Sequence, residues 1–371
     1  MAKLYKYKTL KKVATRLKSD LNDHNAVLVY AFNGTGKTRL SMEFRDLSKK
    51  HKKTPQKNTI YYNAYTEDLF SWYNDPEGDN ERYLNINPDI DFIKGFVELE
   101  RENVLREFLH RYADFDFKID YEKWIVRFHK GDENDIKISR GEESIFIWCI
   151  FLTICQLVVD EDPAYNWVKY IYIDDPISSL DDNNAITIAC DLARILKPIF
   201  KKNKQSDTSE ENKIKVVISS HHSLFHNVMY NELRNAKIAT YFLHKENTDG
   251  YVLQSTNETP FFHHVALISE LDAVSKNGNI NTYHFNVLRS ILEKTSTFFG
   301  YDDFSDCIKK IDENDTILFA RALNLLSHGD YSIFHPVEMT PDNKDLFREI
   351  LRVFLDNYKF KISEIFAQKF N

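Results

Sequence analysis

Apolar and polar positions change their spacing near residue 257, and this change divides the chain into two parts. Before it, short apolar runs alternate with stretches whose apolar positions recur every three or four residues, as in strands connected by helices. After it, apolar positions recur only at helical spacing. The pattern therefore predicts an α/β domain over residues 1–256 and an all-helical domain over residues 257–371.

The α/β domain is predicted to contain a mostly parallel sheet, because its apolar runs are continuous, as in strands buried on both faces. Residues 75–91 hold two prolines and several Asn and Asp residues, so we expect a loop there. Residues 238–244 and 251–255, joined across Asp249-Gly250, are expected to form a closing hairpin. The other predicted strands lie at 26–30, 59–64, within 115–129, at 170–173 and at 215–219, and the predicted helices at 1–21, 39–49, 92–112, 144–159 and 183–200.

The second domain is predicted to be helical over residues 262–275, 284–299, 315–326 and 344–370. Its length of about 110 residues is close to the usual size of a domain. The sequence contains neither an internal repeat nor sustained heptads, so we expect a compact helical domain rather than a long coiled-coil arm.

Composition adds limits to this picture. The 371 residues exceed the size at which single cores stop growing, about 250–300 residues, and a hydrophobic content of 43% is ample for two packed cores. A net charge of −7 gives no global signature of polyanion binding, so any contact with RNA must rest on local patches. The four cysteines, Cys149, Cys155, Cys190 and Cys307, lack metal spacing and are expected to be reduced core residues.

Neither a secretory signal nor a membrane span is predicted. Residues 1–18 are basic but have no apolar core, and the apolar run 145–159 is too short to cross a bilayer of about 30 Å. We expect this run to be a buried helix and the protein to be cytoplasmic.

A phosphate-binding loop is predicted by Tyr30-Ala-Phe-Asn-Gly-Thr-Gly-Lys-Thr38, which lies between a predicted strand and a predicted helix. Gly34 and Gly36 allow backbone N–H groups to approach a phosphate chain, and the helix N-terminus favours its negative charge. Lys37 is placed to reach the β- and γ-phosphates, and the Thr38 hydroxyl to ligate Mg²⁺.

One position departs from the P-loop pattern, because Ala31 stands where its first glycine is expected. An ordinary glycine-rich turn is the alternative. Since Gly-Lys-Thr and both flanking elements fit, we expect the loop to bind a nucleotide, with Asn33 and Thr35 contributing loop contacts beside the two glycines.

A second motif, Ile138-Ser-Arg-Gly-Glu142, resembles the L-S-G-G-Q signature of ABC-type ATPases. The resemblance implies that Ser139 and Gly141, at a helix N-terminus, meet the γ-phosphate held by a second protomer. Arg140 replaces a signature glycine. Taken alone, Ser139 is better explained as an N-cap of the following helix.

Three further segments follow in the order expected of that family. Residues 170–175 resemble a Walker B strand, in which Asp174 holds Mg²⁺ through water and Asp175 takes the place of the catalytic glutamate. Ser178-Ser-Leu-Asp181 resembles the D-loop, and His221 resembles the histidine that senses the γ-phosphate. Individually, Asp-Asp-Pro is also typical of a turn after a strand, and His221 of a core histidine.

Two departures predict slow hydrolysis. The Asp175 side chain is shorter than glutamate by one methylene, which weakens a general base whose reach is about 2.6–3.2 Å. We find no Q-loop glutamine; residues 65–68 lie near where one belongs. A slow NTPase suits a timer or a switch.

The helical domain carries a second candidate site. Arg289 and Glu293 are four residues apart, so they share one face of a predicted helix, and His328 ends another. Such a set cleaves RNA without metal: Glu or His removes the proton of a 2′-OH, the other protonates the leaving 5′-oxygen, and Arg neutralises the phosphate. On spacing alone, a surface ion pair and an ordinary helix-terminal histidine are the more common interpretations.

Motifs across nearly the whole chain resemble the PrrC-type bacterial anticodon nucleases. The residues that carry the resemblance are YAFNGTGKTRLS (30–41), YYNAYTEDLFSW (61–72), the Ser-Arg-Gly-Glu signature, IDDPISSL (173–180), SSHH (219–222), YHFNVLRSILEKTSTFFG (283–300) and residues 325–328.

That resemblance implies an ABC-like NTPase fused to a ribonuclease domain that cuts a tRNA beside the wobble base. Arg289, Glu293 and His328 fall on the family's catalytic set, and the spacing from Arg321 to His328 resembles the R-x₄₋₆-H signature of HEPN ribonucleases, so that Arg321 assists. The implied products are 2′,3′-cyclic phosphate and 5′-OH ends, and the implied substrate is a lysine tRNA.

The resemblance also implies cofactors and partners. These are ATP or GTP with Mg²⁺ at the phosphate loop, no cofactor for RNA cleavage, a homodimer or higher oligomer, and a type I restriction–modification complex that silences the nuclease until a phage disables it. The family's anticodon-reading stretch does not match residue by residue. Phe261, Phe262 and His263 are candidates for base stacking, and core aromatics between the domains are an equal alternative.

Two functions of other classes remain open at the level of sequence. One is an SMC-like DNA-end or defence ATPase whose helical tail binds a partner without nuclease activity. The other is the energising subunit of a membrane transporter, which the altered signature and the helical tail disfavour.

Overall fold

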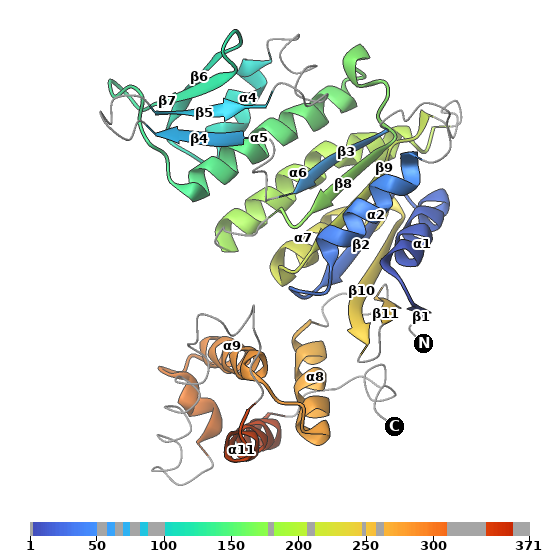
Figure 1. Cartoon of the computed structure of the whole chain (residues 1–371), viewed down its shortest axis with the longest axis vertical. Helices are drawn as coiled ribbons and strands as arrows, with labels where there is room; N and C mark the ends of the chain where they lie inside the picture. Colours follow the sequence, from blue (N-terminus) through green and yellow to red (C-terminus); the bar gives the residue numbers. More distant parts are fainter. Residues whose placement is uncertain are drawn as a thin grey trace. The chain divides into compact units, whose positions relative to one another are not determined.

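The computed structural model consists of two compact units, Ala2–Pro260 and Phe261–Asn371 (Figure 1). The described residues are 3–49, 58–63, 70–74, 82–87, 101–176, 182–205, 212–246, 250–256, 263–309 and 339–358.

A seven-stranded sheet forms the centre of the first unit, in the order β1-β11-β10-β2-β9-β8-β3. The neighbours from β10 to β3 pair in parallel, whereas β11 pairs antiparallel with β10 and with β1. Every residue of β2 is buried, because helices cover both faces of a parallel sheet. The strands are β1 (Leu4–Tyr7), β2 (Ala26–Ala31), β3 (Thr59–Asn63), β8 (Tyr170–Asp174), β9 (Lys215–Ser220), β10 (Ile238–Glu246) and β11 (Gly250–Ser255).

Two separate apolar cores lie on the two faces of this sheet. Val27 and Val29 of β2 join the core that includes α1 (Leu10–Asp23) and α2 (Lys37–Lys49). Ala26 and Leu28 point the other way, toward the larger core. That core includes α5 (Arg140–Val159), α6 (Asp182–Lys202) and α7 (Ser223–Leu233). Alternate residues of β2 thus pack into the two cores, which hold the strand before the phosphate loop from both faces of the sheet.

An antiparallel sheet in the order β4-β5-β7-β6 packs on α5 within the same unit. Phe117 and Phe128 of its inner face make edge-to-face contacts with Phe146 at centroid distances of 5.2 and 5.0 Å. The elements of this part are β4 (Phe70–Asn74), β5 (Arg82–Ile86), α4 (Glu102–Leu109), β6 (Asp116–Asp120) and β7 (Ile125–His129), and two 3-10 turns elsewhere in the unit are η1 (Pro163–Tyr165) and η3 (Arg234–Ala236).

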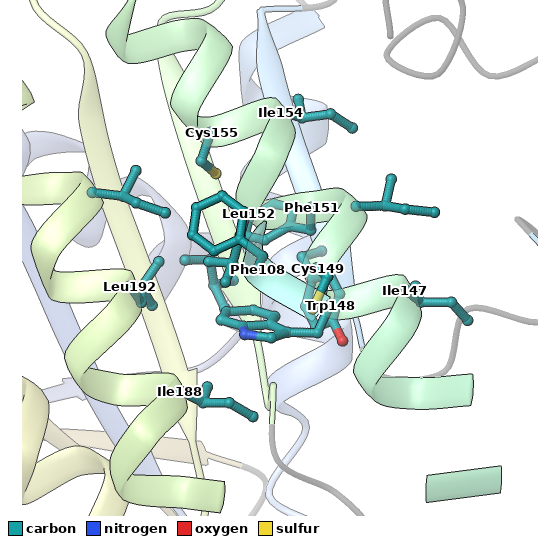
Figure 2. Close-up of a cluster of buried hydrophobic side chains, with 14 of the residues drawn as sticks. Phe108, Ile147, Trp148, Cys149, Phe151, Leu152, Ile154, Cys155, Ile188 and Leu192 are labelled. Atoms are coloured by element: carbon teal, nitrogen blue, oxygen red, sulfur yellow. The ribbon is translucent and has the colours of Figure 1, made fainter. Parts of the chain in front are cut away.

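Helix α5 is apolar on all sides because it runs through the larger core. Three side chains of α5, those of Trp148, Leu152 and Cys155, are fully buried. They lie on the side of α5 that packs against Ile188 and Leu192 of α6 (Figure 2). Among the described residues, α5 alone is long and apolar enough to cross a membrane, but 72% of its apolar window is buried within the fold. The prediction of a buried helix is confirmed, but the helix begins at Arg140 and is therefore longer than the predicted run 145–159.

The second unit is helical throughout its described part. Phe285 of α9 meets Phe347 of α11 edge to face at 5.1 Å, and Leu288, Leu292 and Phe354 complete a buried core between these helices. The elements are α8 (His263–Asn277), α9 (Thr282–Phe299), η4 (Phe304–Ile308) and α11 (Pro341–Asn357). The assignment of the two parts as NTPase and nuclease domains stays a prediction.

Three sequence predictions are wrong. Residues 4–7 form β1 rather than helix, because they pair with β11, a partner far along the chain. Arg82–Ile86 forms β5 inside the predicted loop, because its hydrogen bonds to β4 and β7 outweigh the flanking turn residues. Cys190 is exposed, whereas Cys149, Cys155 and Cys307 are buried as expected. The helix predicted at 315–326 lies outside the described residues.

Candidate functional site

The phosphate loop connects the buried strand β2 to α2. Gly34 and Gly36 have φ angles of 78° and 103°, in the region that L-residues rarely adopt. A Cβ on Gly36 would lie 3.1 Å from Leu10 Cδ1, so the Leu10 side chain would have to shift by a few tenths of an ångström to admit one. The predicted loop geometry therefore depends on both glycines.

Lys37 is buried, and its ammonium group lies at the centre of the loop. Its Nζ donates to the carbonyl oxygens of Ala31 and Phe32 at 3.3 and 3.4 Å and to Asn33 Oδ1 at 3.3 Å. It also lies 3.4 Å from Asp175 Oδ2. The structure thus brings the lysine of the loop and the carboxylate after β8 into one group.

Asp174 ends β8 and is fully buried. Ser219 Oγ donates to its Oδ1 at 2.7 Å, while its Oδ2 is buried without a hydrogen-bond partner in the described part of the chain. Burial raises the pKa of this carboxyl, and hydrogen bonds from Ser219 and Thr38 oppose the rise. A carboxyl group with one unsatisfied oxygen next to the Thr38 hydroxyl fits a hydrated Mg²⁺, because hard cations take oxygen ligands.

Asp175 has a φ angle of 52°, a left-handed conformation that is uncommon for a non-glycine residue. Both oxygens of its carboxylate lie 2.6 Å from His221 Nδ1. Its Oδ1 also accepts a hydrogen bond from Ser220 Oγ at 3.3 Å. Burial opposes ionisation, but the hydrogen bond from His221 and the charge of Lys37 outweigh it and hold the pKa of Asp175 below its usual value. Because an ionised carboxylate only accepts, His221 Nδ1 carries a proton.

Ser219 and Ser220 were missed by the sequence analysis. The parallel register pairs Asp174 with Ser219, which places the two hydroxyls beside the two carboxylates. The signal was present: two apolar strands end in Asp-Asp and in Ser-Ser, and the carboxyl ends of neighbouring parallel strands share one edge of a sheet.

Ser139 caps α5 through a capping box. Glu142 N donates to Ser139 Oγ at 3.3 Å, and Ser139 N donates to Glu142 Oε2 at 2.7 Å. Within the described residues, the Ser139 side chain bonds to Glu142 and not to the phosphate loop, and the Ser139 carbonyl oxygen accepts from Glu143 N. The N-cap interpretation is confirmed, and the contact of Ser139 and Gly141 with a second protomer's nucleotide stays a prediction.

Arg289 and Glu293 form an ion pair on one face of α9. Arg289 Nε donates to Glu293 Oε1 at 2.7 Å, with the two side chains 22% and 46% exposed. The Arg289 guanidinium lies over the Phe304 ring, 5.9 Å from its centroid. His328 and Arg321, the other predicted catalytic residues, lie outside the described residues.

Several other predicted positions are not described either. These are Ser178–Asp181 of the predicted D-loop, residues 65–68, Phe261 and Phe262, and the side chain of His263. In the described part of the chain, no three His, Cys, Asp or Glu side chains gather into a metal-binding group.

Known proteins share this organisation to different degrees. A protein-family model described as an AAA domain, AAA_13, matches residues 98–359. The anticodon nuclease of Escherichia coli is 33% identical over 370 residues, covering 90% of this chain and 89% of that protein. This match spans both units.

Two solved structures show a more distant likeness. An SMC head bound to the C-winged helix domain of ScpA gives a TM-score of 0.31 at 12% identity, covering 62% of this chain and 90% of that one. The SMC head domain from Thermotoga maritima gives a TM-score of 0.27 at 12% identity, covering 62% and 89%. TM-scores this low do not establish a common fold.

Proposed function

This chain belongs to the anticodon nuclease family and to the AAA_13 family of AAA domains, and we propose that it is a tRNA anticodon nuclease gated by a nucleotide at its phosphate loop. The Arg289–Glu293 pair carries the proposal. It occurs in a helical unit on the same chain as a buried Lys37–Asp175–His221 group. The match to a named anticodon nuclease covers 90% of the chain and therefore extends into both units.

The nucleotide side of the proposal rests on the groups that surround Lys37. The loop N–H groups and Lys37 bind the phosphates of ATP or GTP, and Thr38 and Asp174 hold the accompanying Mg²⁺, which supplies charge neutralisation. Asp175 accepts a proton from an attacking water, or only holds the nucleotide, and His221 senses the γ-phosphate. Because the Asp175 carboxylate already binds His221 and Lys37, we expect hydrolysis to be slow.

The RNA side of the proposal follows from the chemistry of ribose. Glu293 or His328 takes the proton from the 2′-OH, the 2′-oxygen bonds to the adjacent phosphorus, and the bond from phosphorus to the 5′-oxygen breaks. The other of the two groups protonates the leaving oxygen, while Arg289, assisted by Arg321, neutralises the phosphorane. The products are a 2′,3′-cyclic phosphate and a 5′-OH, and the step needs no metal.

The wider role remains part of the same proposal. We expect a cytoplasmic homodimer or higher oligomer, in which Ser139 and Gly141 of one protomer complete the nucleotide site of the other. Lysine tRNA is the expected substrate, anti-phage defence the expected setting, and a type I restriction–modification complex the expected silencing partner.

End-mapped sequencing of small RNA tests the proposal, in cells that briefly express the wild type or His328→Ala. Cuts within one anticodon loop that are present only with the wild type support it and identify the tRNA. The same assay on purified protein, with ATP or with GTP, distinguishes a silenced enzyme from an inactive one. Intact tRNA under all these conditions, with nucleotide binding preserved, contradicts the nuclease and favours an ATPase with a partner-binding tail.

A further inference from the structure

A short polar contact joins β3 to the first turn of α2, beside the proposed metal site. Tyr61 lies on the face of the sheet that packs against α1 and α2, and its hydroxyl oxygen lies 3.0 Å from Ser41 Oγ. Ser41 is fully buried, and its Oγ donates to the carbonyl oxygen of Thr38 at 2.7 Å. The contact therefore ends at the residue whose hydroxyl is proposed to ligate Mg²⁺.

The direction of these hydrogen bonds follows from the number of protons. A serine hydroxyl has one proton, and the shorter bond, to the Thr38 carbonyl, uses it. The Ser41 oxygen is then an acceptor, so the Tyr61 hydroxyl donates to it. Burial raises the pKa of Tyr61 to about 12, and the charge of Asp174 adds to the rise, so this phenol keeps its proton at neutral pH. The hydrogen bonds thus form a chain from Tyr61 through Ser41 to Thr38.

The Tyr61 ring is fixed by its neighbours. Its centroid lies 6.2 Å from that of the Tyr172 ring of β8, and the Arg45 guanidinium of α2 lies over the ring at 5.7 Å. Asn63 follows two residues later on the same face of β3, and its side chain forms a hydrogen bond with Tyr61. The Tyr61 hydroxyl therefore has little freedom to move away from Ser41.

Thr38 is held from two sides as a result. Its carbonyl oxygen accepts from Ser41, and its hydroxyl bonds to Asp174, the carboxyl group with one unsatisfied oxygen. A serine that bonds three residues back along its own helix is a common local feature. The donor from β3 distinguishes this one, because it ties the start of α2 to a different element of the fold.

From this chain we propose that Tyr61 and Ser41 are positioning residues, which hold Thr38 in the orientation required for the Mg²⁺ bound with the nucleotide. The inference rests on the nucleotide half of the proposed function and adds two residues that had no predicted role. Partners behind a metal ligand fix its orientation, and their loss weakens metal binding by about 10- to 100-fold. A merely structural contact would instead affect nucleotide binding equally with and without metal.

The affinity of the full-length protein for a nucleotide, with and without metal, tests the proposal. Isothermal titration with the β,γ-imido analogues of ATP and of GTP gives Kd in Mn²⁺ and in EDTA. Tyr61→Phe keeps the ring and removes only the hydroxyl. We expect its Kd in Mn²⁺ to rise about tenfold, and its Kd in EDTA to stay within about twofold of the wild type. Ser41→Ala should behave alike, and the double variant should lose little more, because either change breaks the same chain.

Tyr170→Phe is the matched control. Tyr170 lies on the same face of the neighbouring strand β8 and packs edge to face on Phe44 of α2 at 5.5 Å, so a hydroxyl is removed from a similar setting. We expect it to leave both Kd values unchanged. Thr38→Ala gives a second comparison: in that background Tyr61→Phe should cause no further loss, because its effect passes through Thr38.

Three results overturn the proposal. One is wild-type affinity of Tyr61→Phe in Mn²⁺. The others are a loss of equal size in EDTA and a loss of equal size in the Thr38→Ala background, since each would mean that the hydroxyl acts on the fold and not through the metal ligand. Failure of the wild type to bind either analogue contradicts the proposed nucleotide site itself.

Discussion

The two units hold a carboxylate next to a cation in opposite ways. Asp175 is buried and receives contacts from His221, Ser220 and Lys37, which are brought together by strands far apart in the sequence. Arg289 and Glu293 sit one helical turn apart at the surface, joined by one hydrogen bond of 2.7 Å.

The two groups are expected to differ in how much they contribute to the stability of the fold. The buried group is fixed by several partners, so its removal disturbs the fold as well as the nucleotide. The Arg289–Glu293 pair is partly exposed, so solvent screens it and its contribution to stability is expected to be small. Four variants test whether the two groups differ in this way.

Lys37→Met is expected to lower the rate of NTP hydrolysis by on the order of 1,000-fold, because it removes the cation that faces the phosphates. A radiolabelled phosphate-release assay on purified protein measures the rate. Lys197→Met is the control, since Lys197 pairs with Glu232 at 2.5 Å on the surface of the same unit. Hydrolysis at the wild-type rate in Lys37→Met would show that Lys37 does not act on the phosphates.

Arg289→Ala is expected to slow tRNA cleavage about 100-fold, because the phosphorane loses its neutralising charge. Single-turnover cleavage of the mapped tRNA gives the rate, and Arg289→Lys should recover part of it. Lys276→Ala breaks the pair with Asp272, which has the same spacing of four residues and a length of 2.7 Å, in the same unit. Equal losses in Arg289→Ala and Lys276→Ala would mean that the effect is structural.

Asp175→Asn is expected to lower the free energy of unfolding by about 2 kcal/mol at pH 7, because His221 and the buried Lys37 lose a charged partner. The folded pKa of Asp175 lies below its unfolded value of about 3.9, so this stabilisation is complete above that pH and disappears as the pH falls through the folded pKa. Urea unfolding at pH 7, 5 and 3 measures the difference between wild type and variant. A difference that does not shrink at pH 3 contradicts the assignment.

Glu293→Gln is expected to change the free energy of unfolding by no more than about 0.5 kcal/mol, because the side chain is 46% exposed and the pair is local. The same urea titration applies. A loss as large as that of Asp175→Asn would show that the exposed pair is structural after all.

The residues that the sequence predicted best are those whose relation is local. The spacing of four between Arg289 and Glu293 specifies one helix face without any knowledge of the fold, and the glycines of the phosphate loop reveal their backbone requirement directly. Strand β2 was equally evident, because a continuous apolar run reflects burial on both faces.

The residues that were missed depend on partners distant in the chain. Ser219 and Ser220 acquire their role only when β9 pairs with β8 in a register that puts Asp174 opposite Ser219. Strand β1 exists because β11 lies beside it, and β5 because β4 and β7 do. Single-sequence propensity contains no information on these pairings.

The strand order also determines when the two units can form during synthesis. Strand β2 leaves the ribosome early, but its neighbours β9 and β10 are made only near the end of the first unit, and β1 waits for β11. Such distant pairings close late, because the intervening chain must exist first. The sheet around the phosphate loop is therefore completed just before α8 and α9 emerge, so a nascent chain has the means to bind a nucleotide before it has the Arg289–Glu293 pair.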